Sequence, residues 1–320
     1  MKKHYKIIDL FAGIGGIRLG FEEYGCKCVF TSEWDKYAQQ TYQANFGDLP
    51  AGDITKIEPK DIPDHDILLG GFPCQPFSII GERKGFADTR GTLFFYIEKI
   101  LEVKKPIAFM LENVKQLTSH DGGRTFKTII EHLKALGYHV YHSVLNALDF
   151  GVPQKRERIF IVGFKKRWEF NFPKPTHKRP HLDTLLEKDE DIPKSFFVSE
   201  ELKQDRFQRI KTKPNFPSIW HENKGGNISA LPYSCALRAN ASHNYLLVNG
   251  TRRLTPRELM RLQGFPDTFE IVVSYAQIKK QTGNSVAVPV IKAVAKEIIK
   301  TLNERKMVEP TLIQTNLFED

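Results

Sequence analysis

Cysteine is scarce in this sequence, and no apolar run approaches the length that a membrane-spanning helix needs. The four cysteines, Cys26, Cys28, Cys74 and Cys235, are too few for a disulfide framework in a chain of 320 residues. One residue separates Cys26 from Cys28, which is closer than the usual zinc-ligand spacing, and no other pair completes a set. We therefore expect no metal site, no membrane association and a reducing, cytoplasmic compartment.

Targeting signals and repeats are also missing. The basic residues at the start are not followed by an apolar signal core, and there is no internal repeat or low-complexity tract. With 41% hydrophobic residues, the chain can form one large domain or two moderate ones. Its 47 Lys and Arg residues outnumber 38 Asp and Glu, which gives a net charge of +9. This excess favours a polyanionic partner such as nucleic acid, although charge alone is equally compatible with a generally basic protein.

A glycine-rich turn near the start predicts a nucleotide-binding βαβ unit. The strand expected over residues 5–11 leads into the turn and then into a helical pattern over residues 17–24. The next strand ends at Glu33, where such units bind ribose hydroxyls, although Glu33 could instead cap the following helix. Arg18 stands where the third glycine of the dinucleotide fingerprint would fall, which argues against a cofactor with a pyrophosphate. An adenosine cofactor without phosphates, such as S-adenosylmethionine, remains compatible.

A rigid loop around Cys74 follows the predicted strand 67–69. Two glycines free the backbone, and Pro73 and Pro76 stiffen the chain on either side of the thiol. Open α/β sheets place their chemistry just beyond the strand ends, so this thiol is a candidate nucleophile. The alternative is a small buried hydrophobic side chain, which is the role of most free cysteines.

Acidic residues follow two other predicted strands. Glu112 ends the strand 106–111, at the same sheet edge as Cys74, and Asp53 is expected at a third strand end near an adenine ring. Strand-end acids are also common as helix caps, so the spacing leaves both interpretations open.

Two arginines precede the predicted strand 159–164. If this segment is extended, Arg156 and Arg158 share a face on which two guanidinium groups can bind a carboxylate, a phosphate or a carbonyl oxygen. On an ordinary surface, such a pair is solvated and has no function.

Residues 171–250 lack regular periodicity, because prolines interrupt them and basic and aromatic residues alternate. Segments 223–227 and 238–244 are polar, loop-like and rich in groups that can read base edges. Regularity returns at Thr255, which carries a strong helix-start signal. We expect a second, irregular domain with a small core formed by Leu231, Leu237, Tyr245, Leu246, Leu247 and Val248.

Six short motifs follow one another along the chain. They are Asp9-Leu10-Phe11-Ala12-Gly13-x-Gly15-Gly16, Gly71-Phe72-Pro73-Cys74-Gln75, Glu112-Asn113-Val114, Gln154-x-Arg156-x-Arg158, Arg253-Leu254-Thr255-Pro256-Arg257-Glu258 and Gly283-Asn284-Ser285-Val286. Each is weak alone, but the ordered set is specific. It resembles the cytosine-C5 DNA methyltransferases of the bacterial restriction-modification type, over nearly the whole chain except about residues 171–250.

The resemblance implies an α/β fold, in which a Rossmann-like S-adenosylmethionine-dependent methyltransferase domain carries a smaller, irregular, mainly β target-recognition domain. Residues 1–170 would form the catalytic and cofactor-binding domain, completed by residues 284–320. Residues 171–254 would form the target-recognition domain, and residues 255–283 a hinge that returns to the catalytic domain.

The resemblance also implies a mechanism. A cytosine is flipped out of duplex DNA, Cys74 adds to its C6, and the methyl group of S-adenosylmethionine moves to C5, leaving S-adenosylhomocysteine. Glu112 would assist at N3 and the exocyclic amine, Arg158 would polarise O2, and Arg156 would orient partners or bind phosphate. The base that removes the C5 proton stays open. The positions that match the family's cofactor pocket are Phe11, Ile14, Gly16, Glu33, Trp34, Asp53, Ile54, Pro73, Leu93, Asn284, Ser285 and Val286.

Double-stranded DNA is the implied partner, with a separate cognate restriction endonuclease, for a monomer that acts on the nucleoid of a bacterial cell. The candidate DNA contacts are Gln75, Ser78, Arg158, Lys224, Gly225, Arg238 and Asn240. Two alternatives are a tRNA cytosine-C5 methyltransferase and a catalytically silent DNA-binding module of the same fold. A nicotinamide dehydrogenase is disfavoured by Arg18 and by the absence of a convincing proton-relay histidine. The DNA sequence that is recognised stays open.

Overall fold

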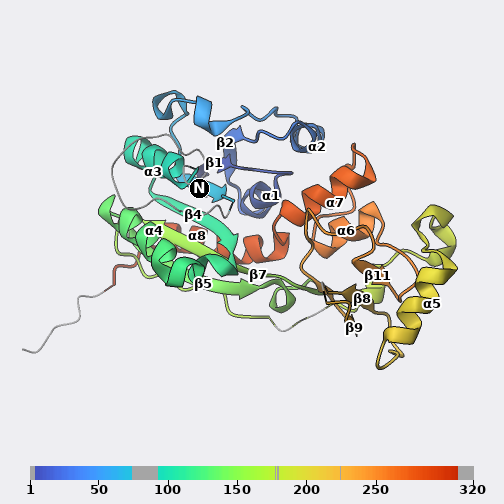
Figure 1. Ribbon diagram of the computed structural model, residues 1–320. Helices are drawn as coiled ribbons and strands as arrows, with labels where there is room; N and C mark the ends of the chain where they lie inside the picture. Colours follow the sequence, from blue (N-terminus) through green and yellow to red (C-terminus); the bar gives the residue numbers. More distant parts are fainter. Residues whose placement is uncertain (1–3, 74–92, 177, 179, 224, 309–320) are drawn as a thin grey trace, which may run out of the picture.

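The computed structural model describes residues 4–73, 93–176, 178, 180–223 and 225–308 (Figure 1). Its centre is a six-stranded sheet in the order β2-β1-β3-β4-β7-β5. The first four strands of this order run parallel, and β7 is antiparallel to both of its neighbours. The strands are β1 (Lys6–Leu10), β2 (Lys27–Ser32), β3 (Ile67–Gly71), β4 (Ala108–Val114), β5 (His139–Asn146) and β7 (Glu157–Phe164).

Helices cover both faces of this sheet, because alternate strand residues point to opposite sides. Ile7 and Met110 belong to a core shared with α1 and α8, whereas Ile8 and Leu111 belong to a core shared with α3 and α4. The helices are α1 (Gly16–Glu22), α2 (Lys36–Phe46), α3 (Leu93–Lys104), α4 (Arg124–Ala135) and α8 (Val288–Glu304). The structure is therefore a Rossmann-like α/β fold, as predicted.

Helix α8 returns to the first strand and helix of the sheet. A Cβ added to Gly20 of α1 would lie 2.4 Å from Cγ2 of Ile291 in α8, so these two helices touch at backbone distance. The hydroxyl of Tyr5 donates to the carbonyl of Leu302, at 3.1 Å. Sequence segments more than 250 residues apart therefore build one layered unit.

A smaller region follows β7 and lies on the right of Figure 1. It contains an antiparallel sheet in the order β11-β8-β9, and a two-stranded parallel pair in which β10 joins β6. Its elements and those that follow are β6 (Gln154–Lys155), α5 (Glu200–Arg209), β8 (Ile219–Glu222), β9 (Ile228–Leu231), β10 (Ser234–Cys235), β11 (Leu246–Val248), α6 (Pro256–Leu262) and α7 (Tyr275–Asn284). Short 3-10 helices are η1 (Ile54–Lys56), η2 (Pro59–Asp61), η3 (Lys115–Thr118), η4 (His120–Gly123), η5 (Ala147–Asp149), η6 (Leu182–Thr184), η7 (Asp189–Asp191) and η8 (Lys194–Phe196).

Helix α5 lies within residues 171–250 and, as predicted for this segment, its sequence lacks apolar periodicity. The Ser199 hydroxyl caps it by accepting a hydrogen bond from the Leu202 N–H, at 3.3 Å. Acidic residues occupy its first turn and basic residues its last turn, which complements the helix dipole. Arg206 is its buried side chain, so the helix lacks the apolar stripe on which a periodicity argument depends.

The prediction that Asp53 lies at the end of a strand is wrong. Asp53 is the N-cap of η1, where one carboxylate oxygen accepts hydrogen bonds from the N–H and the hydroxyl of Thr55, at 3.0 and 2.8 Å. The segment still reaches the sheet, since the Ser32 hydroxyl at the end of β2 donates to the carbonyl of Gly52, at 2.7 Å.

Five of the six residues expected to form a small core in the smaller region are buried. Leu231 is exposed, and Leu237, Tyr245, Leu246 and Val248 pack in one cluster with residues of α6 and α7 and with Ile14 of the glycine turn. The two regions therefore share apolar packing. On the catalytic side, Phe172 still packs against the sheet core, two residues beyond the predicted boundary at 170.

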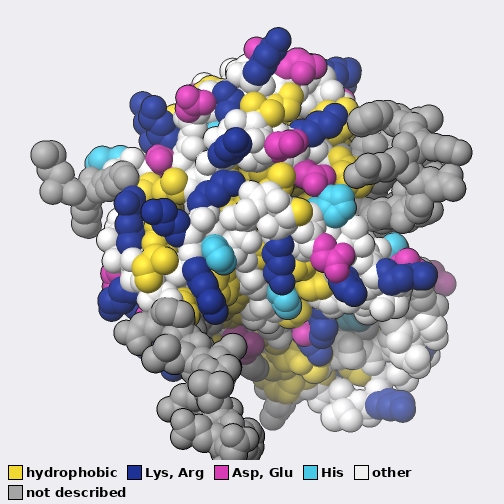
Figure 2. Space-filling view, turned by 90° about the vertical axis from the view of Figure 1, so that its left-hand side faces the viewer, with side chains coloured by type: hydrophobic (Ala, Val, Ile, Leu, Met, Phe, Trp, Pro, Cys, Tyr) yellow, Lys and Arg dark blue, Asp and Glu magenta, His cyan; other side chains and the backbone are white. Residues whose placement is uncertain are grey.

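The face of the sheet region turned away from the smaller region carries mixed charge. Where grey atoms do not cover it, lysine and arginine side chains alternate with acidic, apolar and uncharged ones (Figure 2). The net charge of +9 is thus not gathered into a single basic surface on the visible part of this face.

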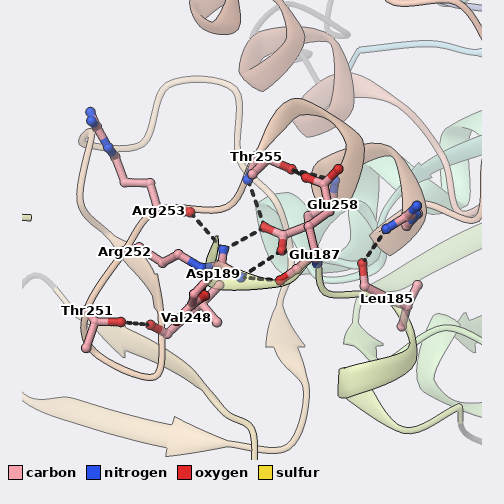
Figure 3. Close-up of polar contacts among 10 residues, drawn as sticks. Leu185, Glu187, Asp189, Val248, Thr251, Arg252, Arg253, Thr255 and Glu258 are labelled. Atoms are coloured by element: carbon pink, nitrogen blue, oxygen red, sulfur yellow. Dashed lines mark hydrogen bonds and ion pairs between the residues drawn. The ribbon is translucent and has the colours of Figure 1, made fainter. Parts of the chain in front are cut away.

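A buried ion pair fastens the smaller region to α6 (Figure 3). Both terminal nitrogens of Arg252 donate to the carboxylate of Glu258, each at 2.9 Å, and both side chains are essentially inaccessible to solvent. Arg252 also pairs with Asp189 at 2.6 Å, and Glu258 completes the predicted capping box by accepting from the N–H of Thr255 at 2.8 Å. The Glu187 N–H donates to the same carboxylate, at 2.8 Å.

Replacing Glu258 with glutamine is expected to lower the free energy of unfolding by about 3 kcal/mol, because it leaves the Arg252 charge buried without its main counterion. Denaturant unfolding of the purified protein measures this. Glu201→Gln, on the exposed side of α5, is the control and should change stability by less than about 0.5 kcal/mol. Equal stabilities of the two variants would contradict the structural role given to this pair.

Candidate active site

Two of the predicted catalytic residues, Glu112 and Arg158, meet at one edge of the sheet. The strands β1, β3 and β4 end there, and the antiparallel strand β7 begins there. Gly71 lies opposite Glu112, and Val114 lies opposite Arg158. This edge is where open α/β sheets bind ligands, next to the switch point between β1 and β3 at which the chain order reverses.

Glu112 and Arg158 form a largely buried ion pair at this edge. The Arg158 Nε lies 3.0 Å from Oε1 of Glu112, and the two side chains are 17% and 10% exposed. Burial raises the pKa of the Glu112 carboxyl, although the positive charges of Arg158 and Arg156 oppose the rise. A raised pKa favours the protonated form of this carboxyl more than in an ordinary glutamic acid.

Arg156 lies two residues from Arg158 but has different hydrogen-bond partners. Its guanidinium is 3% exposed and donates to three backbone carbonyls: those of Leu237 and Gly283, each at 3.1 Å, and that of Ser285. Burial lowers the pKa of Arg156, and the nearby Arg158 charge lowers it further. With these partners, Arg156 binds carbonyl oxygens, which is one of the three options left open by its sequence pattern.

Two positioning residues carry no role in the sequence-based predictions. Asn113 donates from its side chain to the carbonyl of Phe72, at 2.9 Å, and so fixes the backbone just before Pro73. Gln154 is fully buried; it donates to the carbonyl of Leu262 at 2.8 Å and accepts from the N–H of Leu237 at 3.0 Å. Both residues lie inside the motifs named above, but their positioning roles depend on hydrogen-bond partners that are distant in the sequence.

Four predicted site residues lie outside the described part of the chain: Cys74, Gln75, Ser78 and Lys224. Pro73, the last described residue before them, is exposed. Of the other predicted DNA contacts, Gly225, Arg238 and Asn240 are exposed in the smaller region. The structure thus places Arg158 at the sheet edge, beside Glu112, and these three residues in the smaller region.

The glycine turn brings the first and last motifs together. The N–H of Gly13 donates to Oε2 of Glu33, at 2.8 Å, and a Cβ on Gly16 would lie 2.9 Å from Val286 and 3.1 Å from Ser285. Glu33 also accepts the N–H of Asp35, which is itself the N-cap of α2, so the alternative role of Glu33 as that cap is wrong. Burial raises the pKa of Glu33, while the Asp35 and Gly13 N–H groups oppose the rise.

The remaining pocket positions surround this turn. Trp34 is 79% exposed and presents its indole to solvent, whereas Ile14 and Ile54 are buried and pack in the cores. Phe11 is half-buried, and Asn284 is exposed at the end of α7. Leu93 begins α3, whose next residue, Phe94, contacts Phe72 with ring centroids 6.1 Å apart.

These residues fit an adenosine cofactor. No atom of the described residues lies within 4 Å of a Cβ built on Gly13, so these residues leave open space beside the turn. Each oxygen of Glu33 accepts one backbone N–H and keeps a second lone pair that can accept from a ribose hydroxyl. The exposed indole of Trp34 offers a flat apolar surface for a heterocycle. Within the described ranges, no group of three or more His, Cys, Asp or Glu side chains is placed to hold a metal ion.

Asp9 is a buried acid beneath the turn. It is 0% exposed, and neither of its carboxylate oxygens meets a hydrogen-bond partner among the described residues. Burial raises its pKa to about 7, against the opposing charge of Arg18. Arg18 itself is held by Glu22 and Asp48, at 2.6 and 2.7 Å.

Asp9→Asn is expected to remove a pH-dependent loss of stability. Because the folded-state pKa is about 7 and the unfolded value is near 4, the folded protein binds more protons between these values, and its stability falls as pH rises through this window. The variant should therefore gain about 2–3 kcal/mol relative to the wild type between pH 5 and pH 8. Denaturant unfolding at both pH values measures the gain. The prediction would be refuted if the difference in unfolding free energy between variant and wild type were the same at pH 5 and pH 8. It would also be refuted if the control Asp61→Asn, at an exposed site, gained as much stability.

The glycine turn, the acid after β2 and the buried acid–arginine pair at the sheet edge together define a Rossmann-like methyltransferase. The chain matches the family model of C-5 cytosine-specific DNA methylases over residues 5–300, and it belongs to this family. None of the described helices combines the length and apolar character needed to cross a membrane.

Relatives and solved structures agree with this assignment. The chain is 64% identical over 301 residues to the Type II methyltransferase M.HaeII of Haemophilus aegyptius, covering 94% of this chain and 95% of that protein. It is 65% identical over 292 residues to the Type II methyltransferase M.NgoBI of Neisseria gonorrhoeae, covering 91% and 92%. The Entamoeba histolytica methyltransferase EhMeth has the same fold, with a TM-score of 0.74 at 18% sequence identity, covering 94% of this chain and 99% of that chain.

Proposed function

We propose that this protein is a sequence-specific DNA (cytosine-5-)-methyltransferase that uses S-adenosylmethionine and attacks the base with Cys74. The observation that carries the proposal is the buried Glu112–Arg158 pair. Glu112 lies opposite Gly71, the last residue of β3, which is the strand that precedes Cys74 in the sequence. The family supplies the reaction, and the Type II relatives support a role in protecting host DNA within a restriction-modification system.

Cytosine C5 is a poor nucleophile, and a thiolate removes this barrier by adding to C6. The sulfur forms a bond to C6, and the electrons of the C5–C6 double bond move into the ring, so C5 becomes nucleophilic like the carbon of an enamine. The proton on Glu112 can be donated to N3 as charge develops on the ring. Arg158 polarises O2 of the base and, as the counterion of Glu112, keeps that carboxyl in place.

When bound, S-adenosylmethionine supplies an electrophilic sulfonium methyl group. Glu33 would hold the ribose, Trp34 would stack on the adenine, and Asp53 would lie near the adenine edge. The walls of the cofactor pocket would be formed by Phe11, Pro73, Leu93 and Asn284. Its floor would be formed by Gly16, Ser285 and Val286, which pack together at the glycine turn. After transfer, a base removes the C5 proton and the Cys74 sulfur leaves C6, which restores the aromatic ring and the free thiol.

Arg156 acts as a positioning residue in this scheme. Its three carbonyl partners leave its buried guanidinium no access to a phosphate, so the orienting role fits its environment. Because it lies two residues from Arg158, it links the catalytic edge to the segments around Leu237 and Gly283.

Target recognition is assigned to residues 171–254, with residues 255–283 as the hinge and residues 1–170 and 284–320 as the catalytic domain. C6 is covered in stacked duplex DNA, so the cytosine must leave the stack before Cys74 can reach it. We further propose that the protein is a monomer, that it acts on DNA in a bacterial cytoplasm, and that a cognate endonuclease cuts the same sequence when it is unmethylated.

Transfer of labelled methyl groups to plasmid DNA and to tRNA, measured side by side, tests the proposed function. Label in plasmid DNA, retained as 5-methylcytosine at one recurring sequence, is the expected result. Label in tRNA alone would replace the proposal with RNA methylation, and label in neither would support a silent DNA-binding module. Mapping the methylated sites in DNA from an expressing host gives the recognised sequence.

A further inference from the structure

Arg238 stands at the junction between the catalytic edge and the smaller region, in a segment that is held from both sides. Resting on the proposed function, we propose that Arg238 determines target specificity by reading the edge of a guanine in the major groove. Its fixed distance from the catalytic edge would then set which cytosine, relative to that guanine, is methylated.

The catalytic region holds the backbone directly before Arg238. The N–H of Leu237 donates to the side chain of Gln154 at 3.0 Å, and its carbonyl accepts from Arg156 at 3.1 Å. Gly283 packs against the backbone on the other side, since a Cβ there would lie 2.2 Å from the nitrogen of Ala239. The start of the segment therefore moves with the catalytic edge.

The smaller region holds the rest of the loop. Arg206 of α5 donates to the carbonyl of Asn244, at 3.1 Å, and the N–H of Glu222 in β8 donates to the carbonyl of Tyr245, at 3.3 Å. Lys279 of α7 donates to the carbonyl of Ala241, at 3.1 Å. A loop fixed at both ends and in the middle presents its exposed side chains in a defined arrangement.

The guanidinium of Arg238 is oriented although the residue is exposed. It lies over the ring of Tyr245, 5.0 Å from the centroid, and one of its terminal nitrogens is 3.3 Å from Nε2 of His221. The backbone N–H of Arg238 also donates to the Tyr245 hydroxyl, at 3.1 Å. Burial lowers the pKa of His221, and the Arg238 charge lowers it further, which keeps the imidazole neutral and able to accept from Arg238.

Arg209 and Arg252 of this region are already occupied by acids, whereas Arg253 donates to the carbonyl of Ser195 and lies over the ring of Phe196. Arg209 pairs with Asp205 and Glu222, and Arg252 pairs with Asp189 and Glu258. Among the described residues, no carboxylate forms an ion pair with Arg238. An oriented fork without a counterion matches the paired acceptors O6 and N7 that guanine alone presents in the major groove.

The test uses guanine analogues in duplexes that carry the recognised sequence, mapped beforehand with the wild-type protein. Each guanine is replaced in turn by 7-deazaguanine, which lacks the N7 acceptor, and kcat/KM for methyl transfer is measured. At one guanine, the wild type should lose about ten- to hundredfold. Arg238→Ala should lose a similar factor on the unmodified duplex and lose nothing more from the analogue at that guanine.

Two further variants serve as controls. One tests whether the guanidinium fork or only its positive charge is needed, and the other tests whether removing any cation of this region lowers the rate. Arg238→Lys keeps the charge but not the fork, so it should behave as Arg238→Ala does. Lys203→Ala removes a partly exposed cation on α5, which pairs with Glu200, and should keep the wild-type response to every analogue. Thermal melting checks that each variant is folded.

The outcomes distinguish this inference from the proposed function. If Arg238→Ala still responds to the analogue at every guanine as the wild type does, or loses rate equally on all sequences as a phosphate contact would, guanine reading by Arg238 is refuted while the methyltransferase stands. If the wild type methylates no DNA, the proposed function fails first, and the inference falls with it.

Discussion

Replacing Cys74 with serine is expected to lower methyl transfer to DNA by at least about a thousandfold, because removal of an enzyme nucleophile costs at least that factor in comparable cases. A serine hydroxyl is far less acidic than a thiol, so at neutral pH almost none of it is present as the attacking anion. The measurement is single-turnover transfer of labelled methyl groups to duplex DNA with enzyme in excess.

Two controls show that the loss belongs to this thiol. Burial raises the pKa of both Cys28 and Cys235, so Cys28→Ser and Cys235→Ser should retain transfer within a few-fold. DNA that contains 5-fluorocytosine should trap the wild type covalently, since fluorine at C5 cannot leave as a proton does, and should not trap Cys74→Ser. Undiminished transfer by Cys74→Ser would remove the covalent mechanism.

Glu112→Gln is expected to lower kcat by about a hundred- to ten-thousandfold, the usual contribution of a positioned general acid. The amide keeps the shape of the carboxyl and can still donate a hydrogen bond to N3, but it has no proton to transfer. Cofactor binding, followed by equilibrium titration, should stay within a few-fold of the wild type.

The pH dependence adds a second readout to the Glu112 variant. Burial raises the pKa of Glu112, so the protonated form persists to higher pH than for an ordinary glutamic acid, and wild-type activity should fall when that proton is lost. The variant should lack this alkaline decline. Glu157→Gln is the control, because Glu157 lies beside Arg158 on the neighbouring strand β7 and pairs with Lys115 at 2.9 Å. An equal loss in both variants would show that strand β7, rather than the acid, is being disturbed.

The elements that place the chemistry could be predicted because their signals are local. Apolar strands, a glycine turn and a capping box each lie within about ten residues of sequence, and Thr255 forms the predicted box with Glu258. Glu112 and Arg158 meet as the sheet order requires, since acids and bases at strand ends converge on one edge.

The environment of Arg156 could not be predicted, because its partners lie 81 to 129 residues away in sequence. A spacing of two residues indicates a shared face only for regular strand, and Arg156 lies between β6 and β7. Helix α5 was equally hidden, because its stability comes from a cap, end charges and a buried arginine instead of an apolar stripe. Asp53, two residues before a threonine, carried a turn signal that competes with the strand interpretation.

The contact between Gly20 of α1 and Ile291 of α8 fixes an order of events during synthesis. Chains grow at about 5–20 residues per second, so tens of seconds separate the emergence of α1 from that of the helix that covers it. In this interval, the apolar side chains Ile17 and Phe21 of α1 lack the α8 part of the core to which they belong. The core of the main sheet is therefore complete only after the smaller region has been made. With target recognition assigned to that region as proposed, no nascent chain completes this core before it carries its means of choosing a target.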